Sequence, residues 1–245
     1  MVPATEVLAT LRALPVVPLP TLLGGEAPVL VLAPHPDDES LGCGGLIAEC
    51  CARGQDVHVM ILTDGRGSHP RSRAYPWPRL VDLRAKEAGR AAAVLGVGRE
   101  RLTFLGIRDG AAPLFGRPLH RVAQQVEDYV RRHRIGTICT TWEHDPHRDH
   151  LAAFRAARLA AQRCATGLLC YPVWGWTLPD TAWLPAAPIS GARIDVTPYL
   201  PAKASAIACH ASQVSNLIPD DPTGYRIQPA FLALFSGPHE VFVRG

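Results

Sequence analysis

The amino-acid sequence predicts a single α/β domain with a Rossmann-like, doubly wound and mostly parallel β-sheet that helices flank on both faces. Two observations predict this class. Short, continuously apolar runs alternate with longer segments of helical periodicity, and 245 residues are enough for one domain with a full hydrophobic core. We expect this domain to span residues 28–245, preceded by an extension over residues 1–27.

The first elements form a strand, helix, strand unit. Residues 28–33 (PVLVLA) are a short apolar run with β-branched residues, typical of a strand that is covered on both faces. Residues 44–53 predict a helix that Gly54 closes, and residues 56–63 (DVHVMILT) predict a second buried strand. A helix over residues 79–96 follows, because its apolar side chains share one stripe: Leu80, Leu83, Ala88, Ala92 and Leu95.

The same alternation of strands and helices continues along the chain. Further elements are predicted over residues 101–106, 118–133, 136–141, 148–164 and 167–173, in the order strand, helix, strand, helix, strand. A last helix over about 199–212 and a short strand over 240–244 close the fold. Strands joined by helices imply right-handed crossovers and a parallel sheet.

The bulk composition argues against several classes of protein. A formal net charge of +3, from 25 basic and 22 acidic residues, is too even to predict a nucleic-acid partner or binding to a membrane surface. No apolar run approaches the roughly 20 residues of a membrane-spanning helix, and the N-terminus lacks the pattern of an export signal. We therefore expect a cytoplasmic protein.

The cysteines do not form a metal-binding pattern. There are seven of them, an odd number, and no two have CxxC spacing. This usage is typical of reduced thiols in a cytoplasmic protein. A zinc site in this chain must therefore use other ligands.

Polar clusters follow four of the predicted strands. They are HPDDE (residues 35–39), TDGRGSH (63–69), IRDG (107–110) and WEHDPHRDH (142–150). In a doubly wound sheet, ligands bind beyond the carboxyl ends of the strands. The sequence therefore predicts a site at this edge of the sheet.

His35 and Asp38 have the chemistry to bind a divalent metal ion together. Imidazole nitrogen and carboxylate oxygen are usual ligands of Zn²⁺, and catalytic zinc sites take three protein ligands and leave one position open. The third ligand is expected from His144, His147 or His150; residues 147 and 150 share one face of a helix that begins near there. The alternative is that this second cluster only caps the helix.

Asp37 is then a carboxylate beside the metal that is not needed as a ligand. Next to a water whose pKa the metal lowers toward about 7, it is placed to act as general base. Its alternative role is to orient His35. Glu39 is expected to start the helix or to support the ligands, not to act in catalysis.

These motifs resemble those of a known family. APHPDDESLGCGG (residues 33–45) together with HRDH (147–150) resembles the two signatures of the LmbE-like, or PIG-L, family of zinc-dependent deacetylases, which remove the N-acetyl group from N-acetylglucosamine-type substrates. Further agreement runs from about residue 28 to residue 213, through TDGRG, LRAKEAGRAAAVLGV, FLGIRDG and KASAIACHASQ. The partner that this resemblance implies is a small sugar or glycoconjugate substrate.

The resemblance implies a metal centre and two catalytic groups. His35, Asp38 and His150 would hold Zn²⁺, and Fe²⁺ or Co²⁺ suits the same nitrogen and oxygen ligands. Asp37 would be the general base. His147 would be the general acid or the group that stabilises the oxyanion.

The resemblance also implies substrate contacts, and it has departures. Arg84 and Asp109 would contact sugar hydroxyls, with a helix-face charge and a turn aspartate as the alternatives. His210 would line the site or make a structural hydrogen bond. Arg148 stands where the family often has Pro, and Asp145 stands where some relatives have a Tyr that helps to hold the oxyanion.

Other functions remain as alternatives. An amidase that acts on thiol-sugar conjugates or on acylated antibiotic intermediates would use the same metal and base with a different pocket. A nucleotide-binding module, which the glycines of GCGG bring to mind, is disfavoured because the spacing is not GxGxxG and the preceding acids repel a pyrophosphate. A non-catalytic metal scaffold has no use for Asp37. The Trp- and Pro-rich residues 171–190 form a wall over the site or a surface cover.

Overall fold

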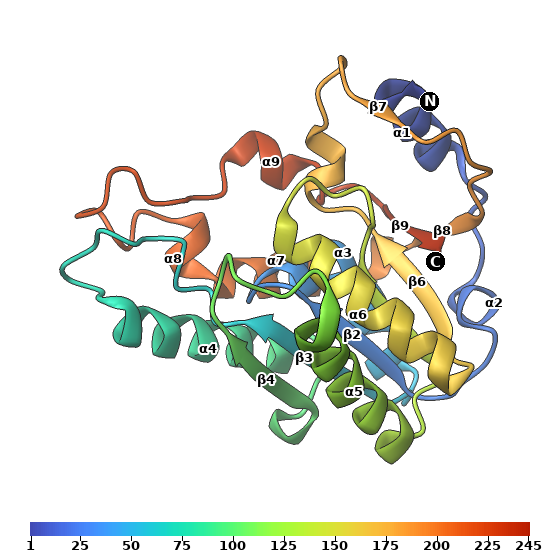
Figure 1. The fold of residues 1–245 in the computed structure, drawn as a ribbon, viewed down its shortest axis with the longest axis horizontal. Helices are drawn as coiled ribbons and strands as arrows, with labels where there is room; N and C mark the ends of the chain where they lie inside the picture. Colours follow the sequence, from blue (N-terminus) through green and yellow to red (C-terminus); the bar gives the residue numbers. More distant parts are fainter.

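In a computed structural model of the protein, which describes residues 1–245, nine strands and nine α-helices follow one another along the chain (Figure 1). The strands are β1 (Val2–Pro3), β2 (Val29–Ala33), β3 (Val57–Thr63), β4 (Leu102–Ile107), β5 (Thr137–Thr141), β6 (Gly167–Tyr171), β7 (Trp183–Leu184), β8 (Gly191–Asp195) and β9 (His239–Arg244). The helices are α1 (Ala4–Ala13), α2 (Leu19–Leu23), α3 (Asp38–Ala52), α4 (Trp77–Val94), α5 (Gly116–His133), α6 (Arg148–Cys164), α7 (Leu200–Cys209), α8 (Ala211–Val214) and α9 (Pro229–Ala233).

Seven of the strands form the central sheet, in the order β4-β3-β2-β5-β6-β9-β8. The five strands from β4 to β6 pair in parallel, and β9 pairs antiparallel with both β6 and β8. The predicted mostly parallel α/β sheet is therefore confirmed. The order reverses between β2 and β5, where a doubly wound sheet opens the crevice that receives a ligand.

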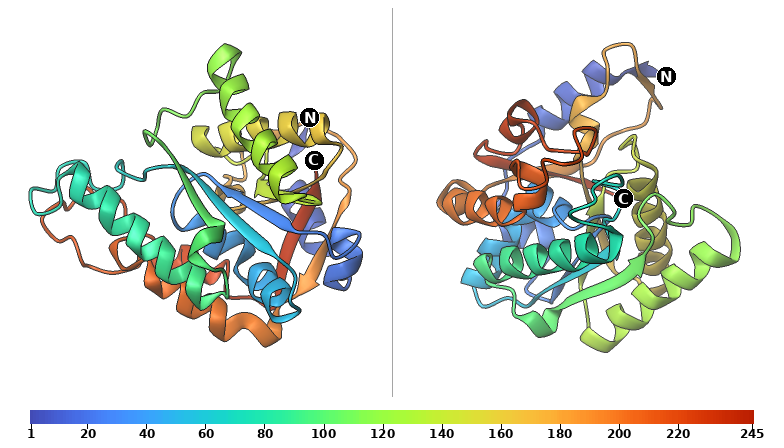
Figure 2. Two further views of the ribbon diagram at one scale, coloured as in Figure 1. Left: turned by 90° about the horizontal axis from the view of Figure 1, so that it is seen from below. Right: turned by 90° about the vertical axis from the view of Figure 1, so that its left-hand side faces the viewer.

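Helices cover both faces of this sheet (Figure 2). Alternate residues of β2 point to opposite faces: Val29 and Val31 join one core with α3 and α4, whereas Leu30 and Leu32 join a second core with α5 and α6. This explains why β2 is apolar at every position. None of the helices is both long enough and apolar enough to cross a membrane.

Helix α3 begins at Asp38, six residues before the predicted start at residue 44. Glycine has a low helix propensity, so the sequence GCGG favoured a loop. Tertiary packing overrides that preference, because a Cβ atom on Gly42 would overlap the ring of Tyr171 and one on Gly45 would overlap Val196. These glycines therefore let α3 lie close to its neighbours, and they do not form a phosphate-binding loop.

Two other expectations differ from the structure. The helix predicted over residues 199–212 is interrupted at His210 and becomes α7 and α8. Strand β8 was not predicted, because GARID has no apolar run; it lies at the edge of the sheet and pairs only with β9 along its length.

The residues before 28 pack against the main fold. Helix α1 contributes Leu8 and Leu11 to the core beneath α5 and α6, and β1 pairs with β7 in a small second sheet. The chain from residue 4 to residue 14 thus shares the hydrophobic core that supports the sheet.

Candidate active site

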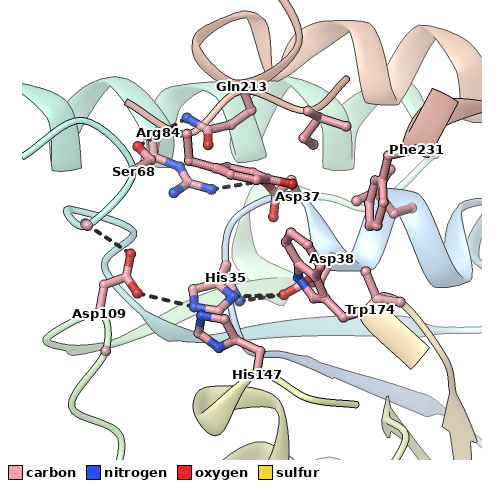
Figure 3. A pocket seen from close by; sticks show the side chains of 16 residues that line it. His35, Asp37, Asp38, Ser68, Arg84, Asp109, His147, Trp174, Gln213 and Phe231 are labelled. Atoms are coloured by element: carbon pink, nitrogen blue, oxygen red, sulfur yellow. Dashed lines mark hydrogen bonds and ion pairs between the residues drawn. The ribbon is translucent and has the colours of Figure 1, made fainter. Parts of the chain in front are cut away.

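One cavity of about 420 Å³ gathers the loops that follow β2, β3, β4 and β5 (Figure 3). His35 comes from the first of these loops, Ser68 from the second, Asp109 from the third and His147 from the fourth. The carboxyl ends of neighbouring parallel strands meet at one edge of the sheet. The predicted clusters therefore do come together.

Three side chains converge on one point beside this cavity. The Asp38 Oδ2 atom lies 3.1 Å from Nδ1 of His35 and 3.3 Å from Nε2 of His150. All three residues are buried, and Nε2 of His150 has no hydrogen-bond partner. Ring nitrogens of His35, His147 and His150 also lie within 4.8 Å of one another. An unpartnered buried imidazole nitrogen beside a carboxylate fits a transition-metal ion.

Carboxylates fix the outward nitrogens of the two buried imidazoles. Nδ1 of His150 lies 2.8 Å from Asp145 Oδ2, and Nε2 of His35 lies 3.2 Å from Asp109 Oδ1 and 3.4 Å from Asp149 Oδ2. Such contacts select the tautomer that turns the other nitrogen toward a metal. Burial alone lowers the pKa of His150, but Asp38 and Asp145 outweigh it and raise that pKa to about 9.

Asp37, the residue before Asp38, borders the cavity in an unusual environment. Burial raises the pKa of Asp37 to about 6, and the Arg84 guanidinium, which donates to Asp37 Oδ2 at 3.0 Å, limits the rise. The backbone N–H of Asp37 donates to Glu39 Oε2 at 3.0 Å. Its φ of 153° is a conformation that favours glycine, so the surrounding bonds hold Asp37 against local strain.

His147 is placed to donate a hydrogen bond as a neutral imidazole and not to act as a positive charge. Its Nδ1 accepts the backbone N–H of Asp149 at 3.2 Å, which leaves Nε2 as the protonated nitrogen of the neutral ring. Burial, together with repulsion from His35 and His150, lowers the pKa of His147 to about 4. Of the two predicted roles, the neutral donor of an oxyanion site suits this geometry better than the general acid.

The three expected substrate contacts occupy different positions. Arg84 lines the cavity, but its guanidinium donates to the carbonyls of Gly65 and Pro36 as well as to Asp37. Asp109 also lines the cavity and is held by His35 and the Gly67 N–H. His210 does not line it. His210 lies 1% exposed behind Glu39, with Nε2 3.2 Å from Glu39 Oε1, and makes the structural contact that was the alternative.

No role in the site was predicted from the sequence for two of its polar side chains, Gln213 and Asp145. Gln213 lines the cavity, and its enclosed Oε1 atom has no hydrogen-bond partner. Asp145 accepts hydrogen bonds from the N–H groups of Val173, Trp174 and Gly175 as well as contacting His150. Gln213 belongs to KASAIACHASQ and Asp145 to WEHDPHRDH, but a linear pattern does not show which backbone groups these side chains will contact.

Asp145→Asn is expected to weaken metal binding by about 10- to 100-fold, because the amide cannot serve both His150 and three backbone donors. The measurement is competition for Zn²⁺ against a chromophoric chelator. Asp180→Asn, at an exposed position outside the cavity, is the matched control and should bind Zn²⁺ as the natural protein does. Equal affinity in both variants would show that Asp145 does not support His150.

Comparisons with known proteins extend this picture. The model of the family PIG-L, GlcNAc-PI de-N-acetylase, matches residues 30–161. A 1D-myo-inositol 2-acetamido-2-deoxy-alpha-D-glucopyranoside deacetylase of Rhodococcus jostii (strain RHA1) is 26% identical over 90% of this chain and 92% of its own. A mycothiol S-conjugate amidase of Streptomyces coelicolor is 32% identical over 54% of this chain and 50% of its own.

A solved structure shares the fold. It is the N,N'-diacetylchitobiose deacetylase from Pyrococcus horikoshii, with a TM-score of 0.68 and 21% identity over 93% of this chain and 87% of that one. The family match covers more than half of the chain and includes both HPDDE and HRDH. The resemblance inferred from these two motifs is thereby confirmed: the chain belongs to the PIG-L family.

Proposed function

We propose that the protein is a metal-dependent amide hydrolase that removes an N-acetyl, or related N-acyl, group from an N-acetylglucosamine-type sugar or glycoconjugate. The observation that carries this is Asp37, a carboxyl with a pKa near 6 that borders the cavity beside the cluster of His35, Asp38 and His150. A purely structural metal site would have no need of it. The family membership and the deacetylase relatives support the same reaction.

His35, Asp38 and His150 are the proposed ligands, with Nδ1 of His35 and Nε2 of His150 as the coordinating nitrogens. This assignment follows because the other nitrogen of each ring is already held by a carboxylate. We favour Zn²⁺, which suits two imidazoles and one carboxylate and leaves a position open. When bound, the ion supplies Lewis-acid activation of the amide carbonyl and of water.

Asp37 takes a proton from the attacking water as the new C–O bond forms at the amide carbon. His147 donates its Nε2–H to the developing oxyanion, a contribution often worth about 3 to 4 kcal/mol. The C–N bond then breaks, and Asp37 returns the proton to the leaving amine. The products are the carboxylic acid, which then ionises in water, and the amine of the sugar. Because one group both takes and returns the proton, His147 can stay neutral throughout.

The polar side of the cavity supports a hydroxylated substrate. Ser68, Asp109 and Gln213 line this side of the cavity, and the Asp109 side chain is 12% exposed. We propose that sugar hydroxyls, directly or through water, form hydrogen bonds with these three side chains.

The test is a metal analysis joined to product detection. The chelated protein, reloaded with Zn²⁺, Co²⁺ or Fe²⁺, is incubated with N-acetylglucosamine and its glycosides, and both acetate and free amine are measured. We expect equal amounts of the two products, and only with metal bound. A fully loaded protein that releases neither product from any N-acyl sugar would exclude the proposed function.

The same assay distinguishes a deacetylase from an amidase that acts on thiol-sugar conjugates. A substrate in which a thiol-bearing acyl group replaces acetyl, compared at equal concentration, reports which acyl group the pocket prefers.

A further inference from the structure

The cavity has two chemically different halves, one on each side of Asp37. Figure 3 shows Ser68, Arg84 and Asp109 on one side of Asp37, and Trp174 and Phe231 on the other. The first half presents hydrogen-bonding groups. The second is apolar and is formed by Leu41, Val173, Trp174, Tyr225, Ile227 and Phe231, which we call the apolar half.

The side chains of the apolar half pack against one another, and this half begins beside Asp37 and Asp38. The Trp174 ring lies 4.9 Å from Phe231 and 5.6 Å from Tyr225, between ring centroids. Phe231 is supported from behind by Phe235 at 5.2 Å. Leu41 follows Asp38 by one turn of α3, with its N–H bonded to the carbonyl of Asp37. An apolar group bonded to the carbonyl carbon of a substrate amide beside Asp37 would therefore contact the apolar half directly.

An amide carbonyl held beside Asp37 has two substituents, which extend in opposite directions. The sugar belongs in the polar half, because Ser68, Asp109 and Gln213 line it and offer hydrogen-bonding groups to the sugar hydroxyls. With the substrate reversed, the acyl group would cover the polar side chains and the sugar hydroxyls would face the rings of Trp174 and Phe231. Both outcomes lose hydrogen bonds that water would have supplied. The acyl group is left for the apolar half.

We propose, on the basis of the proposed function, that the apolar half is an acyl subsite, and that this enzyme prefers N-acyl groups larger than acetyl, such as short alkyl or aromatic acyl groups. A lone methyl group would cover little of a wall that carries three aromatic rings. Trp174, Tyr225 and Phe231 all lie beyond residue 161, where the family match ends. Most of the subsite is therefore formed by segments that follow the part of the chain matched by the family model.

The test is a series of N-acyl glucosamines with acetyl, propanoyl, butanoyl, hexanoyl and benzoyl groups, hydrolysed by the metal-loaded protein. Free glucosamine is the common product, and its amine is measured. We expect kcat/KM to rise about fourfold for each of the first added methylenes, as burial of a CH₂ group predicts. A kcat/KM that stays flat or falls with acyl length, while acetyl is still removed, would overturn the subsite but not the proposed function.

A second series separates the acyl group from the group on the other side of the amide. N-acetylglucosamine glycosides with methyl, butyl and phenyl aglycones are compared under the same conditions. If kcat/KM rises with the size of the aglycone and not of the acyl group, the apolar half binds the aglycone and the assignment is wrong. No hydrolysis of any compound in either series would instead count against the proposed function.

Phe231→Ala locates the effect in the cavity. We expect this variant to lose most of the rise with acyl length, so that the ratio of kcat/KM for butanoyl to that for acetyl falls toward one. Phe115→Ala removes a ring that is 68% exposed and outside the cavity, and it should keep the full ratio. A ratio that Phe231→Ala leaves unchanged would contradict the subsite, and the ratio is unaffected by any loss of folded protein.

Discussion

Asp37→Asn is expected to lower kcat by about 10²- to 10⁴-fold while the bound metal is unchanged. The amide has the same shape, and its oxygen still accepts the Arg84 hydrogen bond, which is 3.0 Å long to Asp37 Oδ2. What it lacks is the ability to take a proton from water and return it to the amine. The measurement is steady-state amine release, with metal content determined on the same samples.

Asp82→Asn is the matched control for this change. Asp82 is exposed on α4, where it pairs with Lys86, and it does not line the cavity. This variant should keep the natural rate. An Asp37→Asn protein that retains its metal and more than half of the natural kcat would exclude Asp37 as the base.

The pH dependence follows from the same carboxyl. Asp37 must be ionised to act as a base, and burial raises its pKa to about 6. A bound cation stabilises the ionised form, so the working pKa lies at or below this value. We expect kcat/KM to fall tenfold for each unit of pH below that pKa and to level off above it. In Asp37→Asn this acid limb should disappear from the residual rate.

The elements that position the site could be predicted because their signals are local. The apolar run of β2 and the abrupt charge of His35 and Asp38 after it stand within ten residues, so strand, edge and ligands are read together. The parallel order of the sheet then brings the second cluster, with His150, to the same place. The contact between these two clusters, which are more than a hundred residues apart, therefore follows from the sheet topology and not from a local sequence pattern.

The supporting groups could not be predicted, since their roles depend on loops far apart in the chain. Asp145 serves a backbone segment 28 to 30 residues later, and the cavity-facing Gln213 is placed by Ser68 and Ser212. The early start of α3 has the same origin, because the neighbours of Gly42 outweigh its low helix propensity. Non-local contacts decide the geometry of the ligands, whereas local patterns decide their identity.

Asp38→Asn should weaken metal binding by more than the roughly hundredfold limit expected for a residue that only supports a ligand. Asp38 Oδ2 is the shared neighbour of Nδ1 of His35 at 3.1 Å and Nε2 of His150 at 3.3 Å, and it also accepts the His35 N–H at 3.0 Å. Asparagine keeps the volume and removes the charge between two imidazoles. Activity should be absent at a metal concentration that saturates the natural protein.

The stability of the metal-free protein gives an independent measurement of the charge interactions of Asp38. Burial raises the pKa of Asp38, but His150 and His35 outweigh it and hold the pKa well below its usual range; the pKa of His150 is raised to about 9. The stabilisation from Asp38 is therefore present above its unfolded value of 3.8 and is lost in acid. That from His150 is present below its unfolded value of 6.5 and is lost as pH rises through about 9.

In the absence of metal, the midpoint temperature of thermal unfolding should be lower for Asp38→Asn than for the natural protein. This difference should be largest between about pH 4 and 6.5 and should become smaller by pH 9. Added Zn²⁺ should raise the midpoint of the natural protein and of Asp82→Asn, but not that of Asp38→Asn, because only a ligand that binds the folded state stabilises it. Equal stabilisation of all three proteins by zinc would place the metal elsewhere and remove Asp38 from its coordination.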